Sequence, residues 1–232
     1  MKKFLLATVS SLALATAASA ADAPAYPRKA PAAAAPWSWQ GFYIGINGGA
    51  AWHRASFNAI DAILTTDSGT IDATGGTFGG HLGYNWQFGN LVLGVEGDVS
   101  WIGGSGTGTS TTFAQAWSTN LSSLATFRGR VGVTMSPTLL YVTGGVAWGR
   151  VSNGGIPGLF GGFPADEGTK TGWVVGAGIE HMLSFAPNWI VRGEVLYVDL
   201  GASSVQGLFG AGYTARFTNK ATLARIGLSL KW

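Results

Sequence analysis

Charged residues are scarce in this chain, and eight of them have types and spacing that could act together. Only 11% of the residues are charged, and within short apolar segments several of these occur two positions apart. The four acids and four bases are Glu96, Asp98, Glu180 and Glu194 against Arg128, Arg130, Arg192 and Arg225. Carboxylates and guanidinium groups held together form ion pairs, which either fill a polar interior or exchange partners to admit ions. The chemistry therefore depends on whether the fold brings these residues to one place.

The histidines offer a second chemistry, nucleophilic or acid–base catalysis. His53 shares a polar segment with Asp61 and Asp67, His81 lies among Gly and Asn residues, and His181 lies next to Glu180. A catalytic triad needs a nucleophile, a base and an acid together, and no such constellation is visible. No His or Asp cluster has metal-ligand spacing either, so we expect no catalytic residues, no metal and no cofactor.

The segments that carry the charges alternate between two kinds of side chain. One side is apolar and rich in Trp, and the other carries the charges together with Gly, Asn and Thr. This period of two is typical of β-strands with two unlike faces. Eight strands are predicted, at residues 42–52, 77–88, 91–101, 125–133, 140–148, 173–180, 189–197 and 222–232.

The connections between these strands alternate between tight and long. Gly, Asn or Pro marks tight turns at 89–90, 134–138 and 184–188. Segments rich in Gly, Ser, Thr and Ala predict long loops at about 53–76, 102–123, 150–171 and 200–221. The result is an antiparallel up-and-down meander with two unlike rims, as in barrels that have short periplasmic turns and long extracellular loops.

A soluble ligand-binding barrel would have the same meander, but its apolar faces would point inward. Eight strands enclose an interior only just wide enough for side chains, and the apolar faces here carry seven of the 10 Trp residues. We therefore predict an all-β fold, an eight-stranded antiparallel up-and-down transmembrane β-barrel. Its apolar faces would meet lipid, and the charged residues would fill the lumen as mutual ion pairs or, alternatively, form a gate.

Aromatic residues gather at both ends of the predicted apolar faces. The outer set is Trp52, Trp101, Trp148, Trp173 and Tyr197, and the inner set is Phe42, Trp86, Phe88, Trp189 and Trp232. Amphipathic rings prefer the two membrane interfaces, so these sets predict two aromatic girdles. At about 3.4 Å per residue and a tilt near 40°, the strand from Phe42 to Trp52 would span roughly 26 Å.

The N-terminal region predicts export. A cationic start, an apolar run over 4–18 and small residues at Ala18 and Ala20 are typical of a signal peptide, here residues 1–20. Residues 21–40 are rich in Ala and Pro and predict an extended linker, followed by the barrel at 41–232.

Composition excludes several classes of protein. Removal of Lys2 and Lys3 with the signal lowers the formal charge from +3 to +1, so no nucleic acid partner is indicated. Without Cys, disulfides and thiolate metal sites are excluded. No stretch after the signal has the roughly 18 apolar residues of a membrane helix. The sequence does not indicate an oligomeric state.

Several segments resemble the small outer-membrane β-barrel family of Gram-negative bacteria, the porin-family and outer-membrane immunogenic proteins related to the transmembrane domain of OmpA. They are GFYIGINGGAAW, GGHLGYNWQFGNLVLGVEGDV, FRGRVGV, LLYVTGGVAWGR and TGWVVGAGIEHMLSFAPNWIVRGEVLYVDLG. The resemblance implies a place in the outer membrane among its lipid and lipopolysaccharide, with a structural or surface-exposed role. The final strand also resembles the signal read by the barrel-assembly machinery, formed by Arg225, Gly227, Leu230 and Trp232, although Phe is the commoner last residue.

The resemblance leaves other functions open. Two of them are a small porin and a lipid A-modifying enzyme. Another is binding of heme or a host surface through unusually apolar loops, although these could instead pack on one another or dip into the outer leaflet. The loop residues concerned are Ile156, Leu159, Phe160, Phe163, Leu208, Phe209, Tyr213 and Phe217.

Overall fold

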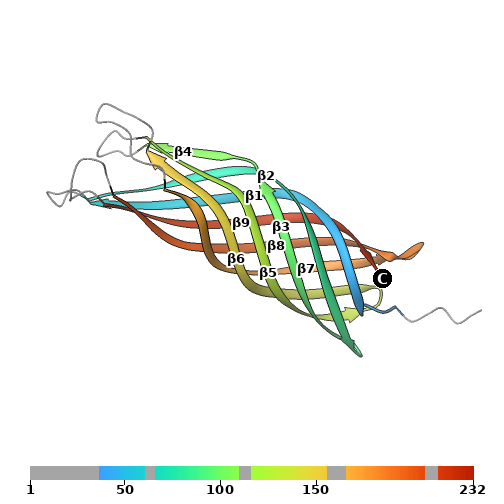
Figure 1. Ribbon diagram of the computed structural model, residues 1–232. Coiled ribbons are helices and arrows are strands. Elements are labelled where there is room, and N and C mark those ends of the chain that lie inside the picture. The colour runs from blue at the N-terminus through green and yellow to red at the C-terminus, as the bar shows by residue number, and fades with distance from the viewer. Residues whose placement is uncertain (1–36, 61–65, 110–115, 156–165, 207–213) are drawn as a thin grey trace, which may run out of the picture. The chain divides into compact units, whose positions relative to one another are not determined.

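The computed structural model describes residues 37–60, 66–109, 116–155, 166–206 and 214–232, which belong to one unit, Trp37–Trp232. The described residues form nine β-strands (Figure 1). They are β1 (Gly41–Ile60), β2 (Thr66–Phe88), β3 (Leu91–Ile102), β4 (Ser105–Thr109), β5 (Ala116–Met135), β6 (Thr138–Gly155), β7 (Asp166–Leu183), β8 (Ala186–Gln206) and β9 (Thr214–Lys231). No helix in this part of the chain is long and apolar enough to cross a membrane.

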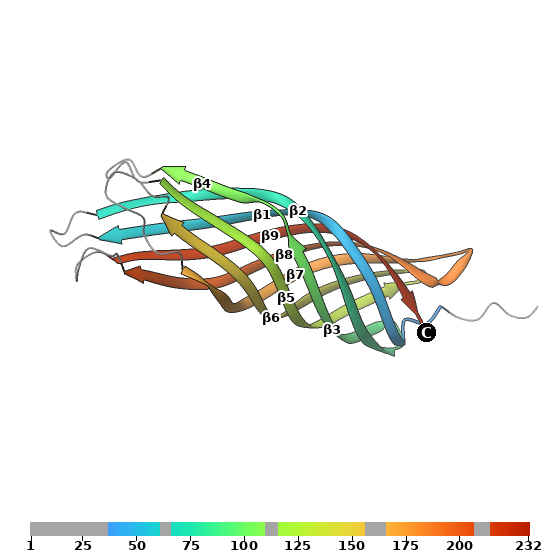
Figure 2. The ribbon, with the colours of Figure 1, turned by 45° about the horizontal axis from the view of Figure 1, so that its top comes forward.

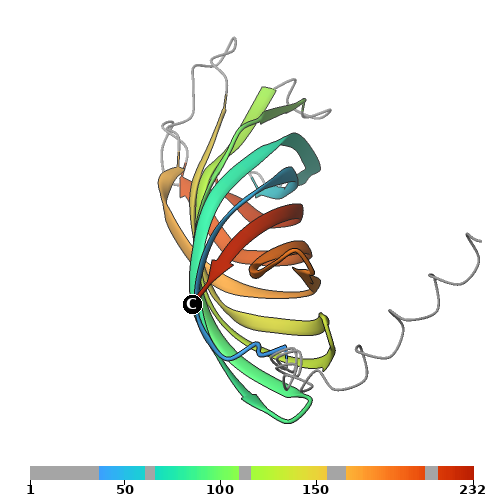
Figure 3. The same cartoon turned by 90° about the vertical axis from the view of Figure 1, so that its right-hand side faces the viewer.

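The strands form a closed antiparallel ring in the order β3-β2-β1-β9-β8-β7-β6-β5-β4, with a further pairing between β3 and β5. The first and last strands meet over their whole length, from Tyr43 opposite Lys231 to Ile60 opposite Thr214. Figure 2 shows β9 (red) between β1 and β8, and Figure 3 views the strands from the end near the C-terminus. The predicted up-and-down barrel is confirmed.

The count of nine differs from the expected eight because one strand is interrupted. β3 pairs with β5 from Leu91 opposite Val133 up to Trp101 opposite Ser123, and β4 pairs with the remainder of β5. Gly104 between them has a φ of +127°, which glycine adopts without the penalty of a side chain. β3 and β4 therefore occupy one position in the ring, on either side of a break at 103–104.

The predicted loop boundaries were wrong, because the strands continue well past them. β1 runs on to Ile60, β2 begins at Thr66 and β5 begins at Ala116. Alternation persists in these extensions with its polarity reversed: Arg54 is exposed on the outer face, while Ala55 and Phe57 are buried inside. A search for strands with an apolar outer face therefore misses them.

Apolar side chains fill the interior at three levels, where "upper" means toward the ends of the strands that lead into long connections. The lower apolar layer contains Trp39, Val92, Leu139, Tyr141, Met182 and Ile190. The upper apolar layer contains Ala51, Ile102, Leu121, Leu124, Ala147, Val151, Val174, Leu196, Val198, Leu200, Ala221 and Leu223. Higher still, the aromatic plug consists of Ala55, Phe57, Ile71, Trp117 and Phe217.

Trp39 lies in the segment that was expected to be linker, yet it is fully buried in the lower apolar layer. Its backbone N–H donates to Oε1 of Gln87 at 2.6 Å, and Trp37 packs against the same layer. Residues 37–40 therefore belong to the barrel. Burying the indole of Trp39 removes a large apolar surface from water, which stabilises the folded unit, whereas an indole in an extended linker would stay exposed. The predicted signal peptide and the rest of the linker lie outside the described residues.

Candidate functional site

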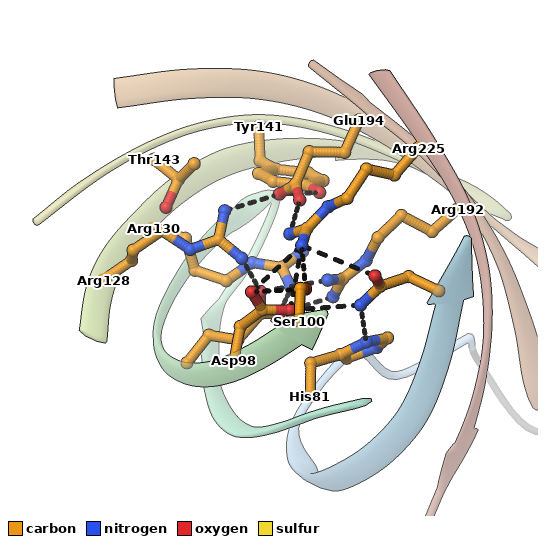
Figure 4. Close-up of polar contacts among 12 residues, drawn as sticks. His81, Asp98, Ser100, Arg128, Arg130, Tyr141, Thr143, Arg192, Glu194 and Arg225 are labelled. Atoms are coloured by element: carbon orange, nitrogen blue, oxygen red, sulfur yellow. Dashed lines mark hydrogen bonds and ion pairs between the residues drawn. The ribbon is translucent and has the colours of Figure 1, made fainter. Parts of the chain in front are cut away.

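The charged layer, formed by the eight acids and bases named first, lies inside the barrel between the lower and upper apolar layers. All of these side chains are buried, because they share the inward parity of their strands. β3 and β5 bring Glu96 opposite Arg128, and β8 and β9 bring Glu194 opposite Arg225. Side chains from opposite walls meet in the centre (Figure 4).

Glu96 is the hub of the charged layer. Arg192 donates to both of its oxygens, from Nη1 to Oε1 at 3.0 Å and from Nη2 to Oε2 at 2.6 Å. Arg128 donates to Oε1, and the Nη1 of Arg130 lies 3.4 Å from Oε2. Tyr43 adds a hydrogen bond from its hydroxyl to Oε2 at 2.8 Å. One carboxylate thus contacts three guanidinium groups, which offsets the penalty of its burial.

The other three acids share the same bases. Glu194 accepts from Arg128 at 2.8 Å and from Arg225 at 2.6 Å, and Glu180 lies 2.7 Å from both Arg130 and Arg192. Asp98 accepts from Nη1 of Arg225 at 3.0 Å. All eight groups therefore form one connected network of four positive and four negative charges.

Tyrosines complete this network, and they were not among the predicted site residues. The hydroxyl of Tyr141 donates to Oε1 of Glu194 at 2.9 Å. The guanidinium of Arg130 lies 4.1 Å from the centre of the Tyr141 ring, within the range of a cation–π contact. Tyr43 and Tyr141 both have the inward parity of the charged residues, so the alternation itself could have identified them.

A histidine–serine pair adjoins the charged layer, and its pairing was not predicted from the sequence, although His81 was expected to face inward as a hydrogen-bonded residue. Nε2 of His81 lies 2.8 Å from Oγ of Ser229, and its Nδ1 lies 3.3 Å from Nδ2 of Asn47, which also donates to Asp98 at 3.1 Å. All of these groups are buried. A Cβ placed on Gly45 would lie 2.6 Å from both Nε2 and Oγ, so the backbone already occupies the space beside the pair.

The other two histidines lie apart from the charged layer. His53 was expected in a loop with Asp61 and Asp67, but it is a buried residue of β1. Burial lowers the pKa of His53, with a smaller opposing effect from Asn219. Asp67 belongs to β2, and Asp61 lies outside the described residues. His181 is exposed, with Nδ1 3.0 Å from Oγ1 of Thr138. Nowhere in the described ranges do three His, Cys, Asp or Glu residues form a group that could hold a metal ion.

The two predicted aromatic girdles lie on the outer face. Nine of the ten side chains are between 39% and 64% exposed, and Tyr197 is half-buried beside Trp173 at a ring distance of 5.5 Å. Trp232 stacks on Phe42 at 6.4 Å across the closing pair of strands. Of the predicted assembly residues, Leu230 and Trp232 point outward, whereas Arg225 is buried in the charged layer.

The apolar loop residues are placed only in part. Phe217 was expected in an exposed loop, but it is fully buried in the aromatic plug. Its ring lies 5.5 Å from that of Trp117, so interior packing accounts for its apolar character. Ile156, Leu159, Phe160, Phe163, Leu208, Phe209 and Tyr213 lie outside the described residues.

Comparisons with known proteins agree with this architecture. The chain is 37% identical over 218 residues to the 31 kDa outer-membrane immunogenic protein of Brucella melitensis, with 87% of this chain and 88% of the relative covered. It is 34% identical to the 22 kDa outer membrane protein of Rhizobium leguminosarum bv. viciae, with 76% and 72% covered. The crystal structure of the outer membrane protease OmpT from Escherichia coli shares the fold, with a TM-score of 0.50, 11% identity, and 83% and 97% covered. The model of the outer membrane protein beta-barrel domain matches residues 4–217, and the chain belongs to that family of outer-membrane proteins.

Proposed function

We propose that this outer-membrane protein is a structural, surface-exposed barrel whose lumen admits no solute. Its relatives from Brucella are named immunogenic outer-membrane proteins, which supports a role at the cell surface. The observation that carries the proposal is the neutral, fully interconnected charged layer held between apolar layers.

The charged layer resists opening because its members share partners. A gate would have to separate buried ions, and removing one partner from a buried pair typically costs about 3–5 kcal/mol. The side chain of Arg192 contacts both Glu96 and Glu180, so moving it breaks several contacts together. The layer therefore acts as filling rather than as a set of exchanging pairs.

The apolar layers add barriers on both sides of the charges. An ion entering from the tight-turn end meets buried Trp39, Leu139 and Ile190. From the opposite end it meets the aromatic plug and then the upper apolar layer. Apolar constrictions exclude water, so an ion would have to shed its hydration to pass them.

Conductance tests this proposal directly. Protein refolded into planar lipid bilayers is expected to produce no discrete current steps in molar KCl, whereas a general porin inserted under the same conditions does. Resistance of the folded barrel to SDS before heating checks that the protein is folded. Reproducible unitary currents from the wild-type protein would overturn the closed lumen.

We also propose that the barrel has no enzymatic role. The similarity to a protease at 11% identity concerns the fold alone. His81 and Ser229 are a potential base and nucleophile, but both are buried beside the backbone of Gly45. Mass spectrometry of lipid A from cells with and without expression is expected to give identical profiles. A mass shift that disappears in His81→Gln would contradict the proposal.

A further inference from the structure

We propose that a cleft on the outer face of the barrel binds the phosphorylated head group of lipid A, the membrane anchor of lipopolysaccharide. The cleft has a volume of about 410 Å³ and crosses β8, β9, β1 and β2. Its outward-facing lining includes Trp52, Arg54, Asp72, Tyr197, Lys220 and Thr222. This inference goes beyond the closed, structural barrel proposed above.

The position of the cleft matches the outer edge of the bilayer. Trp52 and Tyr197 belong to the predicted outer girdle, and Arg54 lies two residues beyond Trp52 toward the long connection. Periplasmic turns are short in such barrels, so this end of β1 faces the cell exterior. Lipopolysaccharide, which the resemblance implies as a neighbour of the barrel, would place its phosphates at the level of this interface, beside the aromatic girdle.

The cations in the cleft face one another. Arg54 on β1 is the direct cross-strand partner of Lys220 on β9, and like charges in that relation repel. Nε of Arg54 lies 2.7 Å from Asp72, which raises the pKa of Arg54. Lys220 has a weaker partner, because its Nζ lies 3.9 Å from Asp199. Asp72 pairs with Arg54 and Asp199 pairs with Lys220, whereas a multivalent anion placed between the two cations would contact both at once.

The lower part of the cleft suits acyl chains. Trp52 is 47% exposed, and the phenol of Tyr197 contacts Trp173 in the same girdle. A cationic upper edge above an aromatic floor fits a molecule with an anionic head and a hydrocarbon body. A free phosphate ion would contact only the upper edge, so the geometry points to a phosphorylated lipid.

Two further outward-facing cations provide matched controls. Arg150 on β6 and Arg216 on β9 are exposed beyond the girdle. Neither lines the cleft. If general attraction between basic residues and an anionic surface governed binding, these two would contribute as much as Arg54 and Lys220.

Native mass spectrometry of the refolded protein in detergent micelles tests the site. Bisphosphorylated lipid A is expected to bind at least about tenfold more tightly than dephosphorylated lipid A or phosphatidylglycerol. Dephosphorylated lipid A lacks the charge-assisted contacts to phosphate, and phosphatidylglycerol places its phosphate differently. Arg54→Gln combined with Lys220→Gln should remove that preference, whereas Arg150→Gln with Arg216→Gln should retain it. Asp72→Asn should strengthen binding, since a carboxylate competing for Arg54 is removed.

Three results would overturn the proposal. One is equal binding of phosphorylated and dephosphorylated lipid A, and another is equal loss in the cleft and control variants. Equal affinity for phosphatidylglycerol would show that the site does not select lipid A. All these residues are exposed, so SDS resistance before heating should be unchanged in every variant. The binding experiment does not depend on conductance. A negative result for lipid A binding is therefore distinguishable from a result that contradicts the closed lumen.

Discussion

At the scale of single residues, the charged layer depends most on Glu96. Its carboxylate contacts Arg128, Arg130 and Arg192, and it is 3% exposed. Glu96→Gln leaves an excess of buried positive charge, so the free energy of unfolding is expected to fall by about 3–5 kcal/mol. Urea titration followed by tryptophan fluorescence in lipid vesicles measures this change.

The matched control is Asp72→Asn on the outer surface. Asp72 pairs with Arg54 at 2.7 Å, but both side chains are more than 60% exposed. Solvent screens such pairs strongly, so this variant should unfold at nearly the wild-type urea concentration. Equal effects of the two substitutions would mean that the charged layer contributes no more than a surface pair.

We expect His53 to make the upper barrel sensitive to pH. Burial lowers its pKa in the folded state below the ordinary value of 6.5. At a pH between these two pKa values, the unfolded chain binds more protons at this residue than the folded protein does. The contribution of neutral His53 to the free energy of unfolding is therefore fully present above pH 6.5 and is lost as the pH falls from 6.5 through the folded-state pKa.

Amide hydrogen exchange in the upper half of β1 measures this effect. Exchange in that segment, corrected for the intrinsic pH dependence, is expected to accelerate between pH 7 and pH 5. His53→Gln removes the titrating group and should flatten the response. A pH response that persists unchanged in this variant would assign the sensitivity to other groups.

The charged residues themselves were predictable from alternation, but their partners across the barrel were not. The sequence places Glu96 and Arg192 on inward faces, because each shares the parity of its strand. Their contact joins residues 96 positions apart, and which inward residues lie level depends on strand tilt and stagger. Pattern alone gives the face of a residue and leaves its height undetermined.

At the scale of elements, the break between β3 and β4 depends on close backbone approach. A Cβ on Gly75 would lie 1.2 Å from the carbonyl oxygen of Gly103, whereas one on Gly76 would meet only the Gly49 oxygen at 3.9 Å. Gly75→Ala should therefore lower the free energy of unfolding by about 1–3 kcal/mol through overpacking. Gly76→Ala should change it little.

Urea titrations of these neighbouring variants, run side by side, provide the comparison. A similar decrease in the free energy of unfolding in Gly75→Ala and Gly76→Ala would show that general strand flexibility matters rather than the contact at Gly103. The sequence could not predict the break at 103–104, because two consecutive Gly residues in a strand are equally compatible with a bulge, a bend or an ordinary exposed position.

The last strand makes a separate prediction. The N–H of Trp232 donates to the carbonyl oxygen of Phe42 at 3.1 Å, and the two rings stack. Deleting Trp232 removes the final aromatic of the proposed assembly signal and both of these contacts with Phe42, so the amount of folded protein in the outer membrane should fall severalfold.

Quantitative blotting of outer-membrane fractions measures this amount. Trp232→Phe is the matched control, since it keeps an aromatic ring at the end of the strand, and it should retain wild-type levels. Normal levels of the deletion variant would contradict an assembly role for this residue.

At the scale of the whole molecule, the sequence predicted the lipid-facing half better than the exterior half. The apolar outer faces and their girdle residues follow one rule from Phe42 to Trp52 and around the ring. Above the level of Trp52 the pattern reverses, with polar side chains outside and apolar ones inside. Water replaces lipid around the barrel there, while Phe57 and Phe217 pack in its interior. Segments that read as Gly- and Ser-rich loops are therefore walls of the same barrel.

The aromatic plug has a consequence for how antibodies would recognise this protein. β1 continues for eight residues beyond Trp52, a rise of about 20 Å at roughly 3.3 Å per residue and the usual tilt. Phe57, Trp117 and Phe217 give this projecting wall its own core. We therefore expect any epitopes on the projecting wall to be conformational, so antisera raised against the folded barrel should lose most of their titre on boiled protein.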